Sequence, residues 1–129
     1  MKLQDAIIAA FSGDLKEFDR LLNPATSGEP INLLSESLQS AIINCPNPSK
    51  AILIFIKYRA EPTEDEIKRW LKVAVQDGCA EPIEQFAGLL LRKNQNLQAC
   101  IKFLNELCNT VPAANPAKTA VAEWIADQL

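Results

Sequence analysis

Apolar residues recur at steps of three and four along almost the whole chain, and runs that alternate apolar with polar residues are missing. Steps of three and four place apolar side chains on one face of a helix, whereas alternation is typical of a strand. The pattern therefore predicts an all-α fold. We expect eight helices in four helical hairpins, near residues 3–12, 14–22, 35–44, 49–58, 63–77, 82–94, 96–108 and 115–125.

Residues suited to helix ends mark the expected boundaries. Thr63 and Glu66 have the spacing of a capping box, and Gly78 suits the end of the helix that they begin. Asp14 is expected to cap the second helix in the same manner, and residues 24–30, rich in Pro, Thr, Ser and Gly, are expected to form a loop. The remaining expected caps and first-turn residues are Ser35, Asn47 with Pro48, Pro82, Asn94 or Asn96, and Asn115 with Pro116.

The chain also repeats itself with a period close to 33 residues. Four helix-ending positions, Gly13, Cys45, Gly78 and Val111, are separated by 32, 33 and 33 residues. Four positions earlier, Ala9, Ala41 and Ala74 keep this spacing, with Leu107 next, and such small residues suit close approach of neighbouring helices in a repeat array. We expect one domain over 1–129, built of approximate repeats 1–34, 35–62, 63–94 and 95–129.

A period near 33 with this internal pattern resembles the ankyrin repeat. Residues 9–22, Ala-Ala-Phe-Ser-Gly-Asp-Leu-Lys-Glu-Phe-Asp-Arg-Leu-Leu, look like that family's stretch from the end of the first helix through the second. Residues 58–62 resemble its turn after the second helix. The family's Thr-Pro-Leu-His element survives only as its leucine, at Leu38 and Leu71, and the loops after Arg59 and Arg92 are short. The resemblance implies protein binding without catalysis, and a generic helical-hairpin array or bundle is the alternative.

Charge and composition narrow the function. Thirteen basic and sixteen acidic residues give a net charge of −3, which argues against nucleic acid or an anionic membrane as partner. Histidine is absent, so the chain has no Ser-His or Cys-His pair and no histidine-ligated metal. The apolar stretch 6–11 is too short for a signal-peptide core or a membrane span. We expect a cytoplasmic protein without cofactor or metal, whose four scattered cysteines are free and mostly buried thiols.

No motif indicates catalysis. The acidic groups at 64–66 and at Glu81 with Glu84 lie at expected helix starts, where carboxylates suit the helix dipole. An enzyme that uses such carboxylates is kept only as a remote alternative. Lys68, Arg69 and Lys72 form the densest basic cluster, which is either a solvated helix face or, with Trp70, a small anion or RNA patch.

The sequence therefore predicts a non-enzymatic module that binds a partner protein through a helix-lined surface, as a monomer or weak homodimer. On the repeat phase, Asp5 and three later first-helix residues precede the repeating leucine-like position and are expected to be exposed. The alternative is a small all-helical bacterial effector or inhibitor of one enzyme, delivered into a host cell, with 122–129 as an export tail instead of a capping helix. The expected partner-binding residues are Trp70, Lys72, Ser37, Gln39, Phe103 and Asn105.

Overall fold

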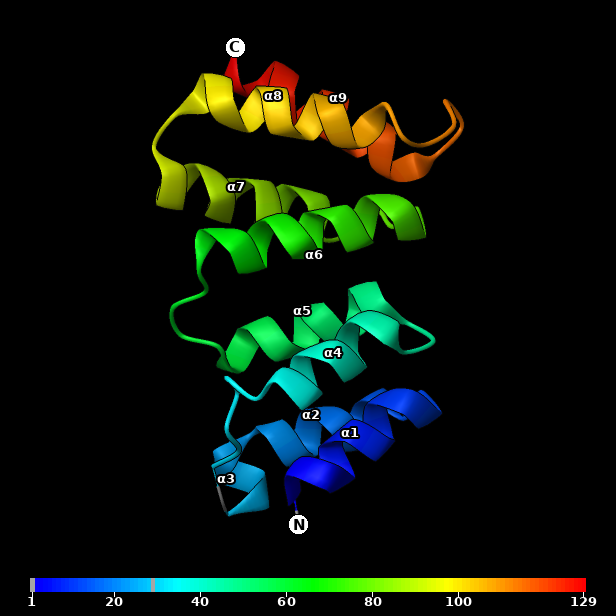
Figure 1. The fold of residues 1–129 in the computed structure, drawn as a ribbon, viewed down its shortest axis with the longest axis vertical. Coiled ribbons are helices and arrows are strands. Elements are labelled where there is room, and N and C mark those ends of the chain that lie inside the picture. The colour runs from blue at the N-terminus through cyan, green and yellow to red at the C-terminus, as the bar shows by residue number, and fades with distance from the viewer. Residues whose placement is uncertain (1, 29) are drawn as a thin grey trace. The chain divides into compact units, whose positions relative to one another are not determined.

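The computed structural model describes residues 2–28 and 30–129, and in these residues the only regular structure is helical. The predicted all-α class is therefore confirmed. Met1 and Glu29 lie outside the described residues, and the predicted loop at 24–30 includes Glu29. The helices within the described ranges are α1 (Lys2–Ser12), α2 (Leu15–Leu22), α3 (Pro24–Ser27), α4 (Glu36–Asn44), α5 (Pro48–Tyr58), α6 (Glu64–Asp77), α7 (Ile83–Asn94), α8 (Leu97–Cys108) and α9 (Pro116–Gln128) (Figure 1).

The chain divides into two compact units, Met1–Glu61 and Pro62–Leu129. The first unit contains α1 to α5, and the second contains α6 to α9. The division falls one residue before the predicted boundary between the second and third repeats. The expectation of one domain over 1–129 stays a prediction.

Two helical hairpins form the first unit. α1 packs on α2 and α4 packs on α5, while α1 also contacts α4 and α2 also contacts α5. Three buried alanines of α1, Ala6, Ala9 and Ala10, keep that helix thin on its packed side, which suits close approach of its neighbours. The largest fully buried side chains of this unit are Phe18, Leu22, Leu38, Ile42, Ile52 and Phe55.

The second unit is organised around α7. This helix forms a hairpin with α6 and also packs against both α8 and α9. α6 packs less extensively than α7 against α8 and α9. The second helix of this hairpin, α7, therefore forms most of the contact with both helices of the next hairpin. The largest fully buried side chains here are Ile67, Leu71, Ile83, Phe86, Leu90 and Leu104.

Local capping chemistry sets most helix ends as predicted. The capping box of Thr63 and Glu66 is complete, and Gly78 ends α6 in the left-handed conformation with φ 69°. Asn96 caps α8 by accepting a hydrogen bond from the Ala99 amide at 3.1 Å. These boundaries depend on residues within one turn of the helix end, so the sequence alone determines them.

Two predicted caps differ from the structure. Asp14 accepts from the Glu17 amide at 3.2 Å, but the Glu17 side chain pairs with Arg20 and does not complete a capping box. Asn47 occupies the N-cap of α5 without a side-chain hydrogen bond, and Pro48 begins the helix as predicted. The fixed φ of proline suits the first helical position without help from a cap side chain.

The expected loop over 24–30 begins with the short helix α3, so the described residues contain nine helices instead of eight. Asn23 and Pro24 stop α2 as predicted, but they also start α3. The Asn23 Oδ1 atom accepts from the Ala25 amide at 3.0 Å, and Pro24 occupies the first turn. Gly28, with φ 76°, ends this helix.

Candidate functional site

The structure removes Trp70 from the predicted binding surface, because this residue is buried. Its side chain is 2% exposed, and its ring packs against Phe86 with 5.9 Å between ring centroids. Trp70 lies on the same buried face of α6 as Ile67, Leu71 and Ala74. The expectation that it is exposed is therefore wrong, and Trp70 offers neither a contact residue nor a ring on which a base could stack.

The other five predicted residues reach the surface to different degrees. Ser37, Lys72 and Asn105 are exposed, whereas Gln39 and Phe103 are half-buried. Ser37 and Gln39 belong to the first unit, and the other three belong to the second. Their role in binding stays a prediction.

Two of these residues have contacts that hold them in place. The Gln39 Nε2 atom donates to the Leu33 carbonyl at 3.4 Å. The Lys68 ammonium lies 5.3 Å from the centroid of the Phe103 ring. This cation–π contact joins α6 to α8. Asp5 is exposed, as the repeat phase predicts.

All four cysteines are free thiols, as predicted. Cys45, Cys100 and Cys108 are buried, and Cys79 is half-buried. Burial raises the pKa of the Cys100 thiol, and the nearby Glu64 carboxylate raises it further. Burial also raises the pKa of Cys108. A raised pKa disfavours the thiolate, which is the nucleophilic and metal-binding form.

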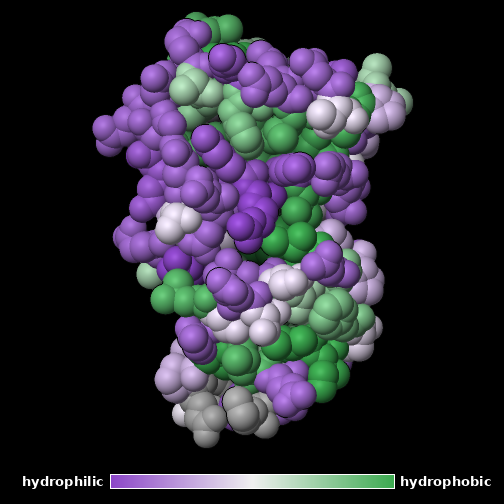
Figure 2. All heavy atoms as spheres, in the orientation of Figure 1, coloured by the Kyte–Doolittle hydropathy of each residue, from purple (hydrophilic) through white to green (hydrophobic). Residues whose placement is uncertain are grey.

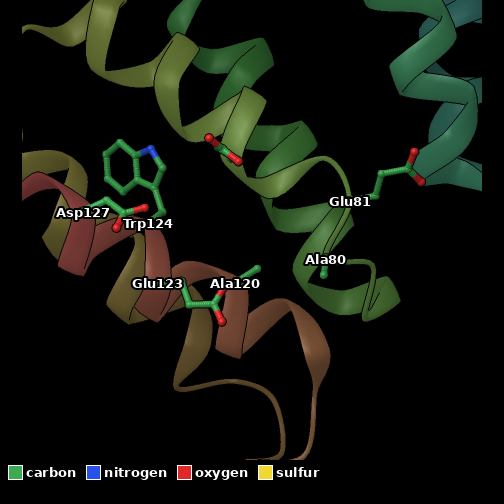
Figure 3. A pocket seen from close by; sticks show the side chains of 7 residues that line it. Ala80, Glu81, Ala120, Glu123, Trp124 and Asp127 are labelled. Carbon is green, nitrogen blue, oxygen red and sulfur yellow. The ribbon is translucent and has the colours of Figure 1, made fainter.

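The strongest candidate site is a groove between α7 and α9, which we call the acidic groove. It has a volume of about 260 Å³ and lies entirely within the second unit. Figure 3 shows that α9 supplies one wall and that the start of the α7 segment supplies the other. Its lining residues are Ala80, Glu81, Glu84, Ala120, Glu123, Trp124 and Asp127.

Helical spacing brings the carboxylates to the groove. Glu84 lies in the first turn of α7, and Glu81 precedes that helix. Glu123 and Asp127 are four residues apart on α9 and share a helix face. All four are exposed, and none has a hydrogen-bond or ion-pair partner among the residues that the structure describes. In Figure 3 Asp127 lies beside the tryptophan, while Glu81 extends from the outer end of the groove. The groove therefore has carboxylates on both walls, and no basic residue lines it.

Trp124 forms the inner part of the groove. It is only 7% exposed, so more than nine-tenths of the residue is buried. Its ring stands up from α9 with the indole nitrogen on the side away from that helix (Figure 3). The indole N–H can only donate, and it has no acceptor among the described residues. The indole nitrogen is not among the buried side-chain atoms that lack a partner, so water can reach it within the groove.

A second hollow, of about 580 Å³, continues along α7. It shares Glu81 and Glu84 with the acidic groove and is further lined by Gln85, Gly88 and Arg92. Gly88 has no atom within 4 Å of the position that a Cβ would take. The surface beside the groove therefore leaves room for a chain that extends beyond it.

Sequence reasoning missed this groove. It placed Glu81 and Glu84 at a helix start and took residues 122–129 as a capping helix or an export tail. The signals were the three- and four-residue spacings within each acidic pair and the tryptophan between Glu123 and Asp127. Nothing in the sequence showed that α7 and α9, about forty residues apart, contact each other.

An exposed apolar pair on the first unit is a weaker candidate. Ile8 and Phe11 lie three residues apart on α1 and are 58% and 51% exposed. Figure 2 shows apolar surface gathered over the α1 and α4 part of this unit. The pair has apolar area but no polar group that would select a ligand.

The described residues form neither a metal site nor a membrane-spanning helix. No three of their cysteine, aspartate and glutamate side chains lie so that they could hold a metal ion. No helix in residues 2–28 and 30–129 combines the length and the apolar character needed to cross a membrane. No protein-family model, curated protein or solved structure matches the chain.

Proposed function

We propose that this chain is a non-catalytic protein-interaction module whose second unit binds a partner protein through a helix-lined surface. The observation that carries the proposal is the acidic groove, which is lined by exposed carboxylates without ion-pair partners among the described residues and by the ring of Trp124. Exposed carboxylates of this kind attract a partner surface that carries complementary positive charge. Tryptophan is also among the residues that contribute most to protein interfaces.

The same residues support binding more than catalysis. General acid–base catalysis uses a carboxylate whose pKa is shifted by burial or by a charged neighbour. The groove carboxylates are exposed to water, and the buried thiols have raised pKa values that oppose nucleophilic attack. The groove, at about 260 Å³, is also smaller than most sites that enclose a whole small molecule.

The predicted first-helix surface enters the proposal as a second candidate contact area. Lys72 and Asn105 remain exposed on α6 and α8, and Phe103 holds Lys68 beside them. This area is basic where the groove is acidic. Variants of each area can therefore distinguish which one a partner uses.

The test begins with the tagged chain as bait in extract of its native cells, followed by identification of captured proteins by mass spectrometry. Each captured protein is then purified, and its binding to the chain is measured by calorimetry. The groove variant Glu84→Gln/Asp127→Asn and the α6–α8 variant Lys72→Glu/Asn105→Lys are compared with Glu36→Gln/Glu106→Gln. The last pair removes two exposed carboxylates outside the groove.

We expect a purified partner that binds the wild-type chain and the Glu36/Glu106 control alike. One of the two surface variants should weaken that binding about tenfold or more, with unchanged helical circular dichroism. The proposal fails if no captured protein binds in purified form. It also fails if every partner binds all variants equally.

A further inference from the structure

We draw no further inference here: the strongest candidate, the exposed apolar pair Ile8 and Phe11 on α1 of the first unit, carries nothing, because the described part of the chain does not show what covers it.

Discussion

The ammonium of Lys57 lies 2.7 Å from the Oδ2 atom of Asp19 and links α5 to α2 in the first unit. The neighbouring Tyr58 hydroxyl donates to the other oxygen of the same carboxylate. α2 and α5 belong to different hairpins, so one carboxylate joins both. These bonds, from Lys57 first and Tyr58 second, hold the pKa of Asp19 below its usual range.

Replacing Asp19 with Asn should lower the free energy of unfolding by about 1 kcal/mol at pH 7, since these groups are partly exposed and water screens the pair. A pKa lower in the folded than in the unfolded chain gives stability that is present above the unfolded value of about 3.9. It is lost as the pH falls through the folded value. Urea titrations between pH 2 and pH 7 should therefore show a weaker acid dependence in Asp19→Asn than in wild type.

Glu17→Gln is the matched control for this prediction. Glu17 pairs with Arg20 on the same helix, at the surface, and joins no second element. We expect its urea midpoint to stay close to that of wild type. Equal losses in Asp19→Asn and Glu17→Gln would show that the bond between α2 and α5 contributes nothing beyond a local surface pair.

A second prediction concerns two asparagines that both cap helices. Asn115 accepts from the Ala117 amide at 2.8 Å and also donates to the Val75 carbonyl at 2.8 Å, so it joins the start of α9 to the end of α6. Asn96 caps α8 within its own turn, where it accepts from the Ala99 amide at 3.1 Å. Asn115→Ala should cost about 2 kcal/mol and Asn96→Ala about 1 kcal/mol, measured by urea unfolding. Equal costs would mean that the Val75 bond adds no stability.

A third prediction follows from the burial of Trp70. Trp70→Ala removes a 2% exposed ring that packs on Phe86, and it should lower the free energy of unfolding by about 3 kcal/mol or more. Trp70→Phe keeps an aromatic ring there and should lose less. The measurement is thermal unfolding followed by circular dichroism at 222 nm. A Trp70→Ala protein that melts like wild type would contradict the buried position of Trp70.

Trp70 also shows how one sequence can give two conflicting predictions. Within its own helix, Ile67, Trp70, Leu71, Ala74 and Val75 follow the steps of three and four that predict one buried face, and all five are buried. The comparison between repeats instead placed Trp70 one residue before the repeating leucine and hence outside. A buried face that is wider than one leucine stripe includes both positions. The local pattern was therefore the better guide.

Helix ends were predictable for a related reason. The caps at Thr63, Asn96 and Asn115 depend on residues within a single turn, which a sequence shows directly. Asn23 and Pro24 end α2 and also begin α3. The sequence analysis used them only as a helix end, so it missed the short helix α3.

The acidic groove depends on contacts that the sequence does not contain. Its walls come from the start of α7 and from α9. The period near 33 residues gave no reason to expect that α7 packs against both α8 and α9. Glu84 and Asp127 line the same groove because α7 packs against α9. Spacing placed Glu123 and Asp127 on one face of α9, and tertiary packing brought that face beside the start of α7.

Two glycines of the second unit give the last prediction. The backbone conformation accepts a side chain at Gly88 but not at Gly78. Gly88 lies inside α7 with ordinary helical geometry and open space where a Cβ would stand, so Gly88→Ala should raise the free energy of unfolding by about 0.5 to 1 kcal/mol. Gly78 ends α6 at φ 69°, where a side chain is strained, and Gly78→Ala should lower it by about 1 kcal/mol. Urea unfolding of both variants under one condition measures the difference. If both substitutions destabilise the chain equally, the open space beside Gly88 is not free in solution, and the hollow next to the acidic groove is filled.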